Sequence, residues 1–199
     1  MNTQRPWQVL LLGGASGVGK TSVSYRFAQH YGVGLTEVDD FQVILEGMTT
    51  PDQQPVLHYW RTHPDEARRM DEEQHLAHML AYSRVMCAAV ELVIANHLDS
   101  RTPIVLEGDF LLPSLAAQSA YNNIATEGQV RAIFLYEGDE QQILRNYHQR
   151  EGEEQRRRAR ASWRHSEWLR QEAERLGIPT IPARPWNTVL TRVVDALET

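Results

Sequence analysis

The sequence predicts an α/β fold in which helices cover both faces of a parallel sheet, and three observations support this. Short, continuous apolar runs alternate with longer segments of helical periodicity along the chain. The first apolar run leads directly into a glycine-rich loop and then into a helical segment. No internal repeat and no low-complexity linker interrupts the 199 residues. We therefore expect a single domain over residues 1–199.

Five short apolar runs are the expected strands. A strand of a parallel sheet that is covered on both faces is apolar throughout, and residues 7–12 (WQVLLL) are of this kind. The last run contains two prolines, which cannot donate to a β-ladder and therefore place it near an edge of the sheet. In chain order the expected strands are 7–12, 35–38, 103–108, 130–136 and 177–182.

The helices follow from the spacing of apolar residues and from signals at their ends. The first helix after the glycine-rich loop is expected to end before Gly32, because glycine readily adopts the left-handed conformation that terminates helices. A short helix is expected at 41–46, with Asp40 capping its N-terminus. The rest of the chain is expected to contain a loop at 49–55, one bent helix or two helices at 64–97, and a last helix at 186–197.

The glycine-rich loop carries the most specific motif in the chain. Residues 14–21 read GASGVGKT and match the P-loop pattern G-x-x-x-x-G-K-S/T at every fixed position. Backbone N–H groups in such a loop turn inward and bind phosphate oxygens, aided by the dipole of the following helix. Lys20, the only lysine among 20 cationic residues, would bridge the β- and γ-phosphates, and the Thr21 hydroxyl would hold Mg²⁺. The residues expected to bind the nucleotide here are Gly14, Ala15, Ser16, Gly17, Val18, Gly19, Lys20, Thr21 and Ser22.

Acidic residues follow two of the expected strands. Ligands of open α/β sheets bind beyond the carboxyl ends of the strands, where Asp39, Asp40 and Glu107 occur. Glu107 is expected to hold Mg²⁺ directly or through water. Asp39 is expected to accept the proton of an attacking substrate hydroxyl, with Asp40 taking that role if the strand ends one residue later. Solvated carboxylates without a chemical role are the alternative for Asp39 and Glu107.

Seven arginines lie within twenty residues after the fourth expected strand. With Gly152 as a hinge, this segment at about 145–165 is expected to form a lid that closes over the triphosphate. Arg150 and Arg157 are the expected phosphate contacts, where they would neutralise charge on the transferred group. A solvated helix face with ion pairs to nearby glutamates is the alternative for most of the cluster. Its members are Arg145, Arg150, Arg156, Arg157, Arg158, Arg160 and Arg164.

Composition and charge argue against several classes of function. The net charge of −6 argues against the basic face that broad nucleic-acid binding needs. We see no apolar run of the ~18 residues that a membrane span needs and no signal peptide at the start of the chain. His75 and His78 lie three residues apart but lack a nearby third ligand for zinc, so packed or solvated histidines are expected. The single cysteine, Cys87, cannot form an internal disulfide, and the chain is expected to be cytoplasmic. We expect no nucleic-acid or membrane partner, and a monomer or homodimer.

Together these motifs resemble those of the small P-loop kinases of the nucleoside and shikimate kinase superfamily. Within it, the long segment after Phe41 and the run Leu111-Leu112-Pro113 are most similar to 2-phosphoglycerate kinase-like proteins. The resemblance rests on the P-loop, Val38-Asp39-Asp40-Phe41, Leu106-Glu107-Gly108, the arginine-rich segment and the turn Ala183-Arg184-Pro185-Trp186.

The resemblance implies a three-layer P-loop NTPase fold with five parallel strands in the order 2-3-1-4-5. It also implies a helical, substrate-binding insert at about 42–98 and a lid. ATP and Mg²⁺ are the implied cofactors, and Asp39 the implied base. Arg184, Pro185 and Trp186 would border the adenine.

The sequence favours a kinase that transfers the γ-phosphoryl group of ATP to a hydroxyl of a small metabolite, which is 2-phosphoglycerate-like, a sugar or a nucleoside. The alternative in another class is a P-loop ATPase or switch that hydrolyses ATP to regulate a partner. A GTPase-type switch needs an N/T-K-x-D motif, which a chain whose single lysine is Lys20 does not contain. A toxin-type kinase acting on a nucleotide sugar remains open within the kinase class.

Overall fold

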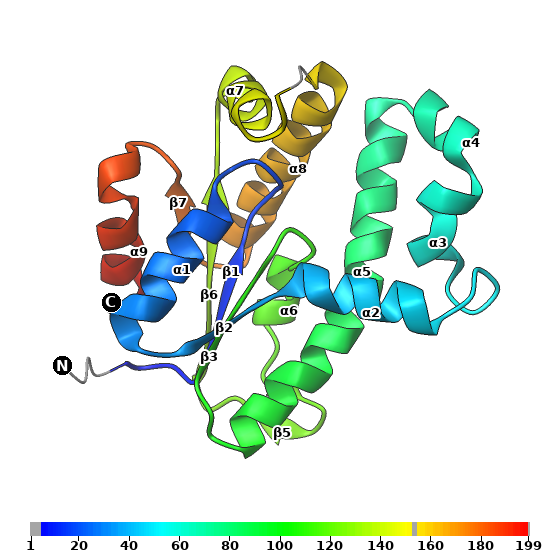
Figure 1. Ribbon diagram of the computed structural model, residues 1–199. Helices are drawn as coiled ribbons and strands as arrows, with labels where there is room; N and C mark the ends of the chain where they lie inside the picture. Colours follow the sequence, from blue (N-terminus) through cyan, green and yellow to red (C-terminus); the bar gives the residue numbers. More distant parts are fainter. Residues whose placement is uncertain (1–4, 153–154, 199) are drawn as a thin grey trace.

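A five-stranded parallel sheet forms the centre of the molecule (Figure 1). The computed structural model describes residues 5–152 and 155–198. The strand order is β2-β3-β1-β6-β7, which confirms the expected order 2-3-1-4-5 for the five strands of the sheet. The strands are β1 (Val9–Gly13), β2 (Gly34–Glu37), β3 (Ile104–Gly108), β6 (Val130–Tyr136) and β7 (Thr180–Pro182). A short hairpin that was not expected pairs β4 (Ala120–Tyr121) with β5 (Ile124–Ala125).

The central strand β1 shows why the run at 7–12 is apolar throughout. It pairs with β3 on one side and β6 on the other, so it has no free edge. Successive side chains of a strand point to opposite faces. Leu11 accordingly packs in one buried cluster and Leu10 and Leu12 in the other, all with no exposed surface. The sheet therefore has a hydrophobic core on each face.

Helices cover both faces of this sheet and extend beyond one of its edges (Figure 1). One core contains residues of α1 and α9, and the other contains residues of α5 and α8. On the β2 side, α2 to α5 form the helical insert, while α7 and α8 pack on each other above the sheet. The helices are α1 (Lys20–Tyr31), α2 (Val38–Met48), α3 (Pro55–Thr62), α4 (Pro64–Arg69), α5 (Glu72–Asp99), α6 (Pro113–Ala116), α7 (Glu140–Glu151), α8 (Arg156–Arg175), the 3₁₀ helix η1 (Trp186–Thr188) and α9 (Val189–Glu198).

Helix α2 begins earlier than the sequence predicted, which corrects the expected role of Asp40. Glu37 is the N-cap residue and makes no side-chain capping bond, and Asp40 lies inside the first turn. The chain turns into the helix directly after β2 because Val38 is buried against Gly108 of β3. A side chain at Gly108 would meet the Cβ of Val38 at 2.7 Å, so this glycine makes room for the turn.

The segment expected as one bent helix or two is divided between α4 and α5. Asp71 lies between the two helices and caps the N-terminus of α5 through a capping box, in which its side chain accepts a hydrogen bond from Gln74 N at 2.8 Å. By length and composition alone, α5 is the one helix of the described chain that could cross a membrane. Its sequence did not suggest this because Arg84 and Glu91 interrupt the apolar positions. Part of its apolar surface is buried in the protein core, including Met86, Val90 and Ile94.

Candidate functional site: a P-loop cleft joined to a second cavity

The P-loop connects β1 to α1, and its backbone can only be built with glycine at key points. Gly14 has φ 144°, and a Cβ at this position would lie 2.3 Å from the backbone oxygen of Leu135 on β6. Gly19 has φ 98°, and a Cβ at this position would lie 2.6 Å from the ring of Trp186. Glycine is therefore needed at both positions. The loop that the glycines allow can turn its backbone N–H groups inward, as a phosphate cradle requires.

The two residues expected around the phosphates and metal, Lys20 and Glu107, are both buried and close together. The Lys20 Nζ donates to Ala15 O at 3.2 Å and lies 3.7 Å from Glu107 Oε1. Burial raises the pKa of Glu107, although Lys20 and a hydrogen bond from the Thr21 side chain lower it. Glu107 Oε2 is buried and has no hydrogen-bond partner in the described chain. A buried carboxylate oxygen without a partner, next to the P-loop hydroxyl, fits the donor set of Mg²⁺.

Asp39 lies in the same cleft, which has a volume of about 750 Å³. Solvent reaches its side chain through the open cleft, but the surrounding walls and three neighbouring carboxylates disfavour its charged form. Burial, followed by the negative charge of Asp109, raises the pKa of Asp39 to about 6, against the opposing effect of Lys20. Asp40 is exposed and lies outside the lining of the cleft. The structure thus brings Asp39, Glu107 and the P-loop together and leaves Asp40 apart.

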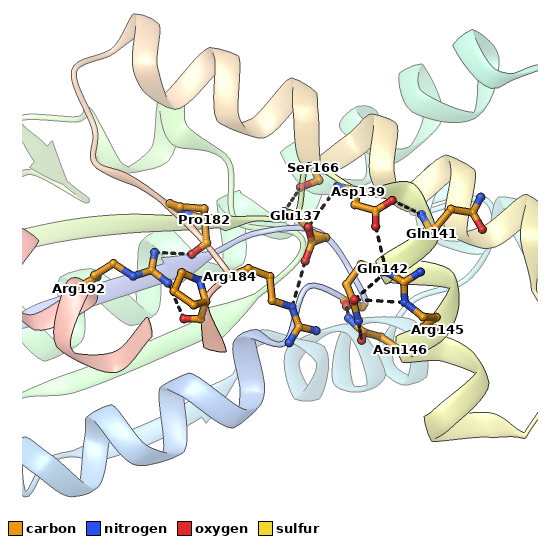
Figure 2. A network of polar contacts seen from close by, with 12 residues as sticks. Glu137, Asp139, Gln141, Gln142, Arg145, Asn146, Ser166, Pro182, Arg184 and Arg192 are labelled. Carbon is orange, nitrogen blue, oxygen red and sulfur yellow. Dashed lines mark hydrogen bonds and ion pairs between the residues drawn. The ribbon is translucent and has the colours of Figure 1, made fainter. Parts of the chain in front are cut away.

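The far end of the cleft is formed by the turn after β7. Arg184 and Trp186 line it, while Pro185, joined to Arg184 by a cis peptide bond, does not. Figure 2 shows that Arg184 points toward Glu137, whose Oε2 lies 3.5 Å from its Nε. Glu137 is itself fixed by its backbone N–H, which donates to Ser166 Oγ at 3.2 Å. The sequence analysis did not single out Glu137, which follows β6 directly and is buried.

The clustered arginines separate into different environments. Arg150 lines the nucleotide cleft and pairs with Glu151 at 2.5 Å, whereas Arg157 lies outside that lining. Arg157 donates to backbone oxygens at the end of α4, among them Met70 O at 2.9 Å. Gly152 ends α7 in the left-handed conformation, and residues 153–154 of the expected lid lie outside the described residues. Ion pairs with carboxylates are made by Arg145, Arg150, Arg158, Arg160 and Arg164.

A second cavity of about 760 Å³ lies beside the cleft, between the insert and α8. Ser16, Asp109 and Tyr147 line both spaces, so the two meet at the P-loop. Helix α8 is attached to this junction because Ser162 Oγ donates to the backbone oxygen of Ser16. The sequence analysis missed Asp109 and His165, which both line the second cavity. Asp109 could have been found two residues after Glu107, just beyond the same strand.

The chain was compared with known families, proteins and structures. No model of a known protein family matches the chain. The chain is 22% identical over 122 residues to a 2-phosphoglycerate kinase of Methanococcus vannielii. That match covers 57% of the chain but only 39% of the relative, so the chain spans well under half of that protein's length.

Two solved structures have a fold similar to that of this chain. A gluconokinase of Sinorhizobium meliloti has a TM-score of 0.50 at 18% identity, and the match covers 98% of the chain and 94% of the gluconokinase. A shikimate kinase of Acinetobacter baumannii, solved with shikimate, has a TM-score of 0.54 at 16% identity, with 96% and 95% covered. The expected resemblance to small P-loop kinases is confirmed for the fold.

Proposed function

We propose that this chain is an ATP-dependent kinase that transfers the γ-phosphoryl group of ATP to a hydroxyl group of a small metabolite. The observation that carries this proposal is the junction of the P-loop cleft with the second cavity at Ser16, Asp109 and Tyr147. An acceptor in the second cavity would meet a nucleotide in the cleft at this point. A P-loop protein that only hydrolyses ATP needs no such second space beside its phosphates.

The P-loop and several other residues of the cleft have roles in this proposal. The P-loop N–H groups would hold the phosphates, and Lys20 would neutralise charge on them. Thr21 and Glu107 would hold Mg²⁺, which when bound supplies further positive charge at the phosphate oxygens. Arg184 and Trp186 would border the nucleotide base at the other end. Arg150 is the arginine of the lid segment whose position in the cleft supports a phosphate contact.

The transfer itself would use Asp39 as the general base. The acceptor oxygen forms a bond to the γ-phosphorus as the bond from that phosphorus to the β–γ bridging oxygen breaks, so that ADP leaves. The proton of the acceptor hydroxyl passes to the Asp39 carboxylate. A base with a pKa of about 6 is ionised at neutral pH and still basic enough for this step. The lid segment would exclude water, which otherwise competes as an acceptor.

The acceptor class that we propose is a hydroxylated small acid, of which 2-phosphoglycerate is the first candidate. The partial similarity to a 2-phosphoglycerate kinase supports this choice. The excess of arginine over acidic residues in the lining of the second cavity supports a negatively charged acceptor. The alternatives within the kinase class are a sugar, a nucleoside or a nucleotide sugar as the acceptor.

The proposal is tested by measuring ATP consumption and the phosphorylated product. The purified protein would be incubated with Mg·ATP and single candidates, among them 2-phosphoglycerate, gluconate and shikimate. We expect consumption well above the rate without an acceptor, and a product that is heavier by one phosphoryl group. Release of inorganic phosphate at the same rate with and without every candidate would instead favour the ATPase alternative.

A further inference from the structure

The second cavity contains a buried histidine that the proposed phosphoryl transfer does not use. His165 lies on the face of α8 that packs against the molecule, with 3% of its surface exposed, and it lines the cavity together with Asp109. Its Nε2 atom is buried and has no hydrogen-bond partner in the described chain. Buried polar atoms are normally paired, so an unpaired one in a residue that lines a cavity points to a ligand group or a water molecule that completes it.

The chemistry of His165 selects the kind of group that it can bind. Burial lowers the pKa of His165 to about 4, which keeps the ring neutral at physiological pH. Burial also lowers the pKa of His75, which lines the same cavity from α5. A neutral imidazole offers one donor and one acceptor nitrogen, which matches a hydroxyl group. Two neutral histidines are poor partners for a carboxylate or a phosphate, which is bound best by cationic groups.

The arginines of the cavity lie at another part of it. Arg156 and Arg157 begin α8, and His165 follows Arg157 by eight residues, which corresponds to about 12 Å along the helix. The guanidinium of Arg157 donates to backbone oxygens of the α4–α5 turn, including Met70 O at 2.9 Å. These partners are neutral, so its positive charge can still attract an anion. The cavity is thus basic near the start of α8, whereas His165 lies near the carboxylate of Asp109.

Apolar side chains form the wall between the insert and α8. Trp60 lines the cavity and is held by His75, with ring centres 5.1 Å apart. Met79 of α5 continues the same wall. Such a wall can contact the carbon skeleton of a ligand, while the polar ends fix its orientation.

We propose, on the basis of the kinase function above, that this cavity binds a hydroxylated organic acid with its hydroxyl-bearing end at His165. Nε2 of His165 makes a hydrogen bond to an acceptor hydroxyl group, next to Asp109 and the P-loop. Arginines at the start of α8 bind the carboxylate or phosphate group of the same molecule. The hydroxyl end therefore faces the nucleotide cleft, and His165 distinguishes hydroxylated acids from acids that lack the hydroxyl group.

The first test observes His165 directly. Protein with ¹⁵N-labelled histidine would be titrated by NMR with 2-phosphoglycerate, gluconate and glucose 6-phosphate, in the presence of Mg·ADP. The His165 signals are assigned by their loss in His165→Phe. His97 is the internal control because its Nδ1 lies 2.8 Å from Thr102 O at the end of α5 and it lines neither space. We expect at least one acid to shift the Nε2 signal of His165 and to leave the signals of His97 in place. Gluconate and glucose 6-phosphate separate carboxylate from phosphate recognition.

The second test separates binding from folding. With an acid that supports ATP consumption, His165→Phe should raise the KM for the acid roughly three- to tenfold, the loss expected for one hydrogen bond. His165→Gln, which can still form such a bond, should recover part of the loss, and His97→Phe should leave this KM unchanged. The KM for ATP should stay the same in all three variants.

The failure of this inference differs from the failure of the kinase proposal. If none of the three acids shifts the His165 signal, or if His97 shifts equally, the inference is wrong. Calorimetry with Mg·ADP on the same protein then reports on the nucleotide cleft separately. Normal ADP binding would leave the kinase proposal in place, whereas no ADP binding would reject it. A His165→Phe variant that only lowers the melting temperature, with the KM for the acid unchanged, would also overturn the inference.

Discussion

Asn146 of α7 donates a hydrogen bond of 2.8 Å from Nδ2 to the backbone oxygen of Gly17 in the P-loop. The start of the expected lid segment is therefore attached to the nucleotide site. The part of the segment that can move relative to the P-loop lies beyond this contact, toward Gly152, where a positive φ of 76° ends the helix.

We predict that hydrogen exchange around Gly152 and the first turn of α8 slows when an ATP analogue and an acceptor bind together. Closure would order backbone that is exposed in the open form. Backbone amides next to Asn146 should already be protected without ligand. Equal exchange around Gly152 with and without ligands would contradict the lid interpretation, and its arginines would then serve mainly as partners of surface carboxylates.

Lys20→Ala should lower kcat by at least about 10²-fold while the protein remains folded, because a buried cation at the phosphates stabilises the transition state. Arg26→Ala removes an exposed positive charge from the same helix and is the matched control. It should leave kcat near the wild-type value. Steady-state kinetics and circular dichroism would measure both variants. An active Lys20→Ala variant would refute the role given to the P-loop.

Asp39→Asn should lower kcat by about 10² to 10⁴, the usual loss for a general base, with little change in ATP affinity. Asp40→Asn is the control, since Asp40 lies in the same first turn of α2 but outside the lining of the cleft. It should cost far less activity. The reverse order of the two effects in steady-state kinetics would show that Asp40 is the base.

The raised pKa of Asp39 also predicts a dependence of stability on pH. Between its ordinary pKa of 3.8 and its folded value of about 6, the folded protein binds more protons at Asp39 than the unfolded chain does. The contribution of Asp39 to the free energy of unfolding therefore falls as the pH rises through this range. Asp39→Asn removes this loss. Without nucleotide or metal, its melting temperature should gain on wild type between pH 4 and pH 7.5, and a constant difference would contradict the shift.

Gly14→Ala should destabilise the protein by at least about 2 kcal/mol, because alanine is strained at φ 144° and its Cβ would meet a backbone oxygen. Gly152→Ala is the matched control, with φ 76° but open space around the added atom. It should cost only about 1 kcal/mol. Urea denaturation of both variants would measure the difference. Equal losses would mean that the contact with Leu135 gives way easily.

The sequence was most informative where one segment determines its own structure. The apolar run at 130–136 became β6 with the same bounds, and Gly32 ended α1 in the left-handed conformation as expected. Helix α3 was missed because its amphipathic pattern spans only eight residues, after a loop rich in proline and glutamine. Local signals of this length do not distinguish a short helix from a turn.

The second cavity could not be predicted in the same way. His165 and Asp109 lie 56 positions apart in the chain and gain their common surroundings only when α8 and the loop after β3 meet at this cavity. In the sequence, His165 lies among arginines that indicate a solvated helix face. It is buried because it shares the inner face of α8 with Ser162, which meets the P-loop. Such pairings follow from tertiary packing and leave little trace in local patterns.

The shared wall at Ser16, Asp109 and Tyr147 has a consequence for inhibitor chemistry. A nucleotide analogue tethered through its terminal phosphate to a hydroxylated acid would extend across this wall into both spaces. Its second half would bind at the high effective concentration that the first half creates. The nucleotide half would fit many P-loop proteins, whereas the acid half would meet His165 and Trp60. A tethered compound of this kind would therefore owe its selectivity to the cavity and its potency to the linkage.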